Sequence, residues 1–226
     1  RIMDEAEKKM FNIMQKKNQK GYAAIKDILV DTFAGLEKLY NQKQHITGVP
    51  TGFVDLDYKT AGLHNSDLIL VAARPAMGKS AFALNLITNA ALKANAAVVY
   101  FSLEMSKEEL TGRILASEAM VDSLKIRSGK LEDNDWINLT NSAGTISEAK
   151  IFLDDSVGYT PTELRAKCRK MKMEHDIGMI VIDYLQLMNA SKASASRQAD
   201  ISEISRSLKM LAKELGIPII ALSQLS

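Results

Sequence analysis

The spacing of hydrophobic residues changes near residue 46. Before it, apolar side chains recur every three or four positions, which predicts amphipathic helices. The first covers about residues 1–18, with a stripe made of Met3, Ala6, Met10 and Ile13. A polar break follows, and a second helix is predicted from Tyr22 to Tyr40. The second helix is open to two interpretations, a core helix or a helix docked elsewhere; the break favours docking elsewhere for the first.

From Ile46 onward, a turn-rich segment of Gly, Pro and Thr leads into strands that alternate with helices. Most strands are continuous apolar runs, which indicates a parallel sheet covered on both faces. The predicted strands are Leu68–Ala72, Ala97–Phe101, Ile151–Leu153, Met179–Ile182 and Ile217–Leu222. The predicted helices are about Ser80–Ala94, Lys107–Met120, Asp133–Ser142, Pro161–His175 and Ile201–Leu215. This alternation predicts a three-layer α/β domain.

Two of these helices carry explicit start signals. Ser106 and Glu109 have the spacing of a capping box, as do Thr160 and Glu163. Cys168 shares the apolar face of the helix that Thr160 begins, and we interpret it as a core residue rather than a nucleophile.

Composition excludes several classes of protein. The 226 residues are 46% hydrophobic and 25% charged, as in an ordinary globular protein. One cysteine and three scattered histidines offer no disulfide and no zinc-ligand spacing. No apolar run approaches the ~18 residues of a membrane span, so we expect a cytoplasmic protein without a membrane partner. A net charge of +2 is small for a monomer that holds DNA through phosphate contacts alone. A protein of this charge that binds nucleic acid would have to use a few specifically positioned residues, or several subunits together.

The strongest chemical signal is the segment ARPAMGKS, which lies between a predicted strand and a predicted helix. It consists of Ala73, Arg74, Pro75, Ala76, Met77, Gly78, Lys79 and Ser80. In that context a Gly-Lys-Ser sequence predicts a phosphate-binding loop whose backbone N–H groups surround phosphate oxygens. Lys79 would reach the β- and γ-phosphates of ATP, and Ser80 would bind Mg²⁺. Ala73 stands where the usual pattern has glycine, which reduces access to positive φ.

Three further positions complete the predicted site. Asp183 ends the apolar run MIVID, where nucleotide-hydrolysing domains place the acid that holds Mg²⁺. Tyr184 follows it rather than an acid, so the base that orients the attacking water must come from elsewhere. Glu104, just after the strand AVVYF, is the candidate base, and Gln224 at the same sheet edge is a candidate γ-phosphate sensor. The alternatives are an accidental placement of Asp183 at the end of a buried strand and, for Glu104, an ordinary acid that precedes a helix.

Taken together, these segments resemble the DnaB type of replicative DNA helicase, within the RecA-like ATPases. The resemblance rests on ITGVPTGFVDLD (46–57), LILVAARPAMGKSAFALN (68–85), VVYFSLEMS (98–106), IRSGKL (126–131), MIVIDYLQLM (179–188) and the last 26 residues, ISEISRSLKMLAKELGIPIIALSQLS (201–226). In this family alanine at the first glycine position is usual, so Ala73 supports the resemblance. The amino-terminal DEAEKKM resembles the linker helix of the family.

The resemblance implies an ATP- and Mg²⁺-dependent helicase that moves 5′ to 3′ on single-stranded DNA as a homo-hexameric ring. It implies that Glu104 is the catalytic base, that Asp183 is the Walker B acid and that Gln224 is the sensor. It also implies that Lys79 and Ser80 bind phosphate and Mg²⁺. A primase and a helicase loader are the implied partners. The linker helix would pack on the ATPase domain of a neighbouring subunit.

The polar loop 189–199 is open to two interpretations. It is either a solvated surface loop or the counterpart of the central-channel loop of the family, in which Lys192 and Arg197 would contact DNA.

The domain organisation inferred from the resemblance is a linker helix over residues 1–20 and a RecA-like ATPase domain over 21–226. We expect the C-terminal part of that domain, including an arginine finger, and the N-terminal collar to be missing from this chain. The alternative functions are a RecA-like recombinase and a helicase loader that binds ATP and DNA without unwinding.

Overall fold

The computed structural model describes residues 24–42, 46–188 and 197–225. The chain divides into two compact units, residues 1–44 and 45–226. In the first unit, α2 (Ile25–Gln42) corresponds to the second predicted helix. Its apolar stripe is exposed within this unit, with Ile25, Leu29 and Phe33 between 44 and 70% accessible. The first predicted helix and the predicted boundary at residue 20 lie outside the described residues.

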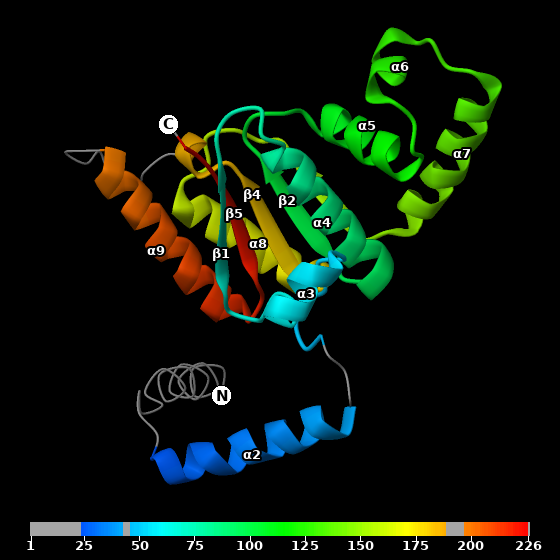
Figure 1. The fold of residues 1–226 in the computed structure, drawn as a ribbon. Helices are drawn as coiled ribbons and strands as arrows, with labels where there is room; N and C mark the ends of the chain where they lie inside the picture. The colour runs from blue at the N-terminus through cyan, green and yellow to red at the C-terminus, as the bar shows by residue number, and fades with distance from the viewer. Residues whose placement is uncertain (1–23, 43–45, 189–196, 226) are drawn as a thin grey trace, which may run out of the picture. The chain divides into compact units, whose positions relative to one another are not determined.

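A five-stranded sheet forms the centre of the second unit (Figure 1). Its strands are β1 (Leu68–Ala73), β2 (Val98–Ser102), β3 (Ile151–Asp154), β4 (Met179–Asp183) and β5 (Ile219–Gln224). Their order is β1-β5-β4-β2-β3, and every neighbouring pair is parallel. All five strands were predicted, each to within two residues at either end.

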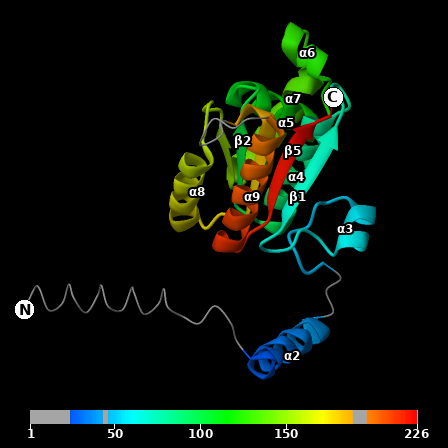
Figure 2. The same ribbon diagram turned by 90° about the vertical axis from the view of Figure 1, so that its left-hand side faces the viewer.

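Helices cover both faces of this sheet, which confirms the predicted three-layer α/β architecture. The helices α8 (Pro161–His175) and α9 (Arg197–Leu215) lie on one face, and α4 (Lys79–Ala94) with α5 (Lys107–Glu118) lies on the other (Figures 1 and 2). Alternate strand residues supply the two cores, because successive side chains of a strand point to opposite faces. Phe101 therefore packs with α8 and α9, and Tyr100 packs with α4 and α5.

The remaining helices are where the predictions need correction. The short helices α3 (Val54–Thr60) and α6 (Ser123–Ser128) were not predicted, because six or seven residues are too few to show a helical period. The helix α7 (Asp133–Glu148) continues past its predicted end at Ser142, because Ile146 packs against the core.

The start of α9 is a second correction. It begins at Arg197 rather than near Ile201, so the predicted loop 189–199 is too long at its C-terminal end. Asp200 lies in the first turn of this helix, where a carboxylate complements the helix dipole.

The capping predictions are confirmed for one helix and partly confirmed for the other. Thr160 and Glu163 make both hydrogen bonds of a capping box at the start of α8. At the start of α5, Ser106 accepts from the backbone N–H of Glu109, but the Glu109 carboxylate pairs with Arg113 instead of closing the box. Cys168 is buried in the core as predicted, and burial raises the pKa of its thiol to about 12.

A buried carboxylate anchors the segment that leads into the sheet. Asp57 is 5% exposed, and its two oxygens accept hydrogen bonds from the Thr51 N–H and hydroxyl, both at 2.8 Å, and from the Gly52 N–H at 3.0 Å. The Asn89 side chain on α4 then donates to the Thr51 carbonyl. Through Thr51, the side chains of Asp57 and Asn89 thereby join α3 to α4, the helix that follows the phosphate loop.

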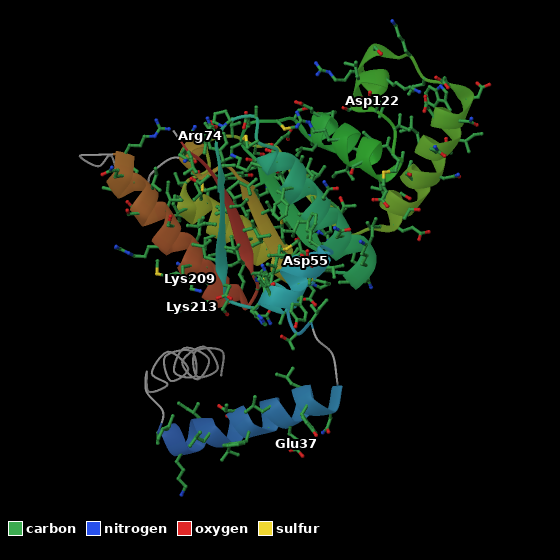
Figure 3. All side chains as sticks on the ribbon, in the orientation of Figure 1. Glu37, Asp55, Arg74, Asp122, Lys209 and Lys213 are labelled. Carbon is green, nitrogen blue, oxygen red and sulfur yellow. The ribbon has the colours of Figure 1, made fainter. Side chains whose placement is uncertain are left out.

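We expect Asp57→Asn to lower the free energy of unfolding by about 1–3 kcal/mol, because one carboxylate acceptor becomes an NH₂ group facing N–H donors. Asp55→Asn is the matched control: Asp55 is exposed on the same helix and lies at the end of the sheet opposite to that of Arg74 (Figure 3). Chemical denaturation of both variants measures the difference. Equal stabilities would show that the Asp57 hydrogen bonds do not anchor the segment.

Candidate nucleotide-binding site

The predicted phosphate loop forms the turn between β1 and α4. Gly78 has φ +82° and precedes the first residue of α4, Lys79. A Cβ on Gly78 would meet no other atom within 4 Å, so glycine is favoured there by backbone conformation and not by space. Ala76 also has positive φ, whereas Ala73 is an ordinary residue of β1. The expected conformational cost of alanine at position 73 is therefore absent.

The predicted acid, Asp183, contacts the predicted phosphate loop. It ends β4, is 1% exposed, and lies beside the first turn of α4. The Ser80 hydroxyl donates to Asp183 Oδ2 at 2.6 Å, and Lys79 Nζ lies 3.5 Å from Asp183 Oδ1. Three residues from segments about 100 positions apart thus form one cluster, as predicted.

Two tyrosines complete this cluster. The hydroxyl of the fully buried Tyr100, on β2, donates to Asp183 Oδ2 at 2.6 Å. Burial, together with the charge of Asp183, raises the pKa of Tyr100 well above its ordinary value, so its hydroxyl stays a proton donor. Lys79 Nζ lies 4.4 Å from the centre of the Tyr184 ring, where the aromatic face attracts the cation.

Glu104 and Gln224 line the same cleft as the phosphate loop. The cleft has a volume of about 490 Å³ and is bounded by residues 73–81, Glu104, Met105, Glu109, Arg113 and Gln224. Gln224 faces Ala73 across the β1–β5 pair. Its backbone carbonyl accepts from the Gln186 side chain at 2.9 Å, which ties the end of β5 to the segment after β4. The structure therefore brings every predicted nucleotide-site residue to one edge of the sheet.

Sequence reasoning missed two side chains of this cleft. Arg113 and Glu109 both reach it from α5, and they form an ion pair of 2.9 Å with each other. Their spacing of four residues on a helix that follows Glu104 was the available signal. Arg113 is a third cationic side chain in the lining of the cleft, beside Arg74 and Lys79, and such cations favour a polyanionic ligand.

The residues present fit a magnesium–nucleotide complex. Asp183 Oδ1 is buried and makes no hydrogen bond, and the Lys79 ammonium lies 3.5 Å from it. A metal ion or a metal-bound water would satisfy the remaining lone pairs of this oxygen. The N–H groups at the start of α4 and the side chain of Lys79 offer positive charge to phosphates at the same edge. Hydroxyl and carboxylate oxygens are the ligands that Mg²⁺ prefers.

Of the two predicted DNA contacts, one lies among the described residues. Lys192 lies outside the described residues, and Arg197 is the first residue of α9.

Comparison with known proteins decides the family. The sequence profile described as "DnaB-like helicase C terminal domain" matches residues 48–226. The chain belongs to this family.

Two curated relatives of the DnaB-like family match the whole chain. It is 50% identical over 226 residues to the replicative DNA helicase DnaB of Geobacillus stearothermophilus. It is 48% identical over the same length to the replicative DNA helicase DnaC of Bacillus subtilis (strain 168). The chain spans about half the length of these relatives, 50% of each.

Solved structures agree with the DnaB-like assignment. One of them, an isolated ATPase domain, matches with a TM-score of 0.84 and 37% identity, covering 91% of this chain and 72% of that one. The structure titled "The Structure Of A DnaB-Like Replicative Helicase And Its Interactions With Primase" matches with a TM-score of 0.79 and 34% identity, covering all of this chain and 54% of that one. The sheet and its covering helices are thus the RecA-like ATPase fold of DnaB-like helicases.

Proposed function

We propose that the protein containing this chain is an ATP-driven replicative DNA helicase and that this chain carries its motor domain. The observation that carries the proposal is the cluster of Lys79, Ser80 and Asp183, of which Lys79 and Ser80 line one cleft together with Glu104, in a chain of the DnaB-like family. The proposed partners are single-stranded DNA, five further copies of the chain in a ring, a primase and a helicase loader. The proposal includes 5′ to 3′ movement and a cytoplasmic location.

In this proposal ATP lies with its phosphates along residues 73–80. Backbone N–H groups of the loop and the Lys79 ammonium bind the β- and γ-phosphates, while Ser80 and Asp183 hold Mg²⁺. Mg²⁺, when bound, supplies Lewis-acid stabilisation of charge on the phosphate oxygens. Glu104 orients the attacking water and accepts its proton, which requires an ionised carboxylate within reach of the γ-phosphate. Gln224, at the end of β5, contacts the γ-phosphate and reports its loss.

Unwinding tests this function against its alternatives. We expect the full-length protein to separate a forked duplex with a free 5′ single-stranded tail when ATP and Mg²⁺ are present. We expect it to leave intact a duplex that has only a 3′ single-stranded tail. A helicase loader or a recombinase would bind ATP and DNA without separating the fork. Strand separation without ATP, or none on either fork, would contradict the proposal.

No helix in the parts of the chain that the structure describes is long and apolar enough to cross a membrane.

For DNA, we retain Lys192 and Arg197 as proposed phosphate contacts. Lys192→Ala together with Arg197→Ala should weaken binding of single-stranded DNA by the full-length protein regardless of base sequence. It should also flatten the salt dependence, because up to ~2 fewer counterions are released for each contacting subunit. Titration of labelled oligonucleotides at several salt concentrations measures both effects.

The matched control removes two exposed lysines far from this edge of the sheet. Lys93 lies in the last turn of α4, and Lys213 lies near the end of α9 opposite to Arg197 (Figure 3). The double substitution Lys93→Ala with Lys213→Ala changes the net charge by the same amount. Equal loss of affinity in both double variants would show a general charge effect and return the loop to an ordinary surface loop.

A further inference from the structure

The Asp183 carboxylate has an uneven set of partners. Oδ2 accepts two hydrogen bonds of 2.6 Å, one from Ser80 on α4 and one from Tyr100 on β2. Oδ1 accepts none, although it is buried, and its nearest cation is the Lys79 ammonium at 3.5 Å. One oxygen is therefore saturated by hydroxyl groups, and the other is left for a charged ligand.

Sheet register explains why Tyr100 can reach this carboxylate. Tyr100 pairs with Val181, and Ser102 pairs with Asp183, across the parallel strands β2 and β4. Side chains two residues apart on a strand share a face, so Tyr100 and Asp183 both point to the face that α4 covers. The long tyrosine side chain spans the two-residue offset along the strands, so its hydroxyl reaches the Asp183 carboxylate.

Two donors from different elements restrict the carboxylate more than one does. The terminal torsion of an aspartate is broad, so a single hydrogen bond leaves its plane free to turn. Ser80 approaches from the helix and Tyr100 from the neighbouring strand, and together they fix which oxygen binds the hydroxyl groups and which lies beside Lys79. Ser80 is itself a proposed metal ligand, whereas Tyr100 lies beneath the site and has no other proposed role.

We propose that Tyr100 is a positioning residue for the metal: its hydroxyl holds Oδ2 of Asp183 so that Oδ1 is presented to the Mg²⁺ of a bound nucleotide. The proposal rests on the proposed function of the cleft as a magnesium–nucleotide site. Groups that orient a metal-binding side chain typically affect metal affinity about 10- to 100-fold. Loss of the Tyr100 hydroxyl should therefore change the Mg²⁺ requirement more than the affinity for the nucleotide itself.

Tyr100→Phe tests this, because it removes the hydroxyl and keeps the ring. Binding of a fluorescent ADP analogue to the full-length protein is measured in EDTA and then during titration with Mg²⁺. We expect unchanged affinity in EDTA and an increase of about tenfold in the Mg²⁺ concentration at half-effect. Steady-state ATP turnover should fall at low Mg²⁺ and recover at high Mg²⁺, which a purely structural role would not produce.

Tyr159→Phe is the matched control. The Tyr159 hydroxyl also donates to a carboxylate at the end of a strand, Asp154 Oδ2 at 3.0 Å, but it lies outside the nucleotide cleft. This variant should keep the wild-type Mg²⁺ dependence. A thermal unfolding curve for each variant, together with the affinity in EDTA, verifies that the domain and its phosphate loop are folded.

A double-mutant cycle tests whether Tyr100 acts through the same carboxylate as Ser80. If both hydroxyls orient the same oxygen, Tyr100→Phe should have a smaller effect on the Mg²⁺ requirement in a Ser80→Ala background than in the wild type. A wild-type Mg²⁺ requirement in Tyr100→Phe would overturn the proposal about this residue alone. A wild-type protein whose nucleotide binding does not respond to Mg²⁺ would instead overturn the proposed function of the cleft.

Discussion

Glu104→Gln should bind ATP and Mg²⁺ like the wild type and yet hydrolyse ATP about 10²-fold or more slowly. Binding should persist because the phosphate loop and the Ser80–Asp183 pair do not involve Glu104. Hydrolysis should fall because an amide cannot accept the proton of the attacking water. Steady-state phosphate release and equilibrium binding of a fluorescent ATP analogue, measured on the same preparation of the full-length protein, separate the two effects.

The matched control for this prediction is Glu118→Gln. Glu118 is exposed at the end of α5 and does not line the cleft. It should hydrolyse ATP at the wild-type rate. Normal hydrolysis by Glu104→Gln would mean that Glu104 is an ordinary acid before a helix and that another group serves as the base.

Lys79→Ala should reduce ATP turnover by roughly 10²–10³-fold or more, because charge that develops on the transferred phosphoryl group loses its cation. Unlike Glu104→Gln, it should also weaken nucleotide binding, since the ammonium contacts phosphate in the ground state as well. Lys93→Ala, at the far end of the same helix α4, is the control and should resemble the wild type in both measurements. Tight nucleotide binding by Lys79→Ala would contradict the placement of the phosphates along the loop.

The strands were predictable because their pattern is local. Buried parallel strands are continuous apolar runs, and runs such as Met179–Ile182 need no knowledge of their neighbours. The short helices α3 and α6 were not predictable in this way, because they complete too few turns to show a period. The start of α9 was missed because residues before Ile201 are small and polar, although they continue the helix.

Local sequence patterns also predicted only part of the site. Lys79, Ser80 and Asp183 each belong to a local motif, so their convergence could be predicted from the amino-acid sequence. Tyr100 carries no motif: its role depends on β2 lying next to β4 and on the register of that pair. Strand order and register arise from the packing of the whole domain, so the periodicity of hydrophobic residues along the chain does not predict them.

The central claim is that this cleft drives movement on DNA, and ATP turnover by the full-length protein with and without single-stranded DNA tests it most directly. We expect Mg²⁺-dependent hydrolysis that rises when single-stranded DNA is added, and no comparable rise in Glu104→Gln. Hydrolysis at one unchanged rate with and without single-stranded DNA would contradict the claim.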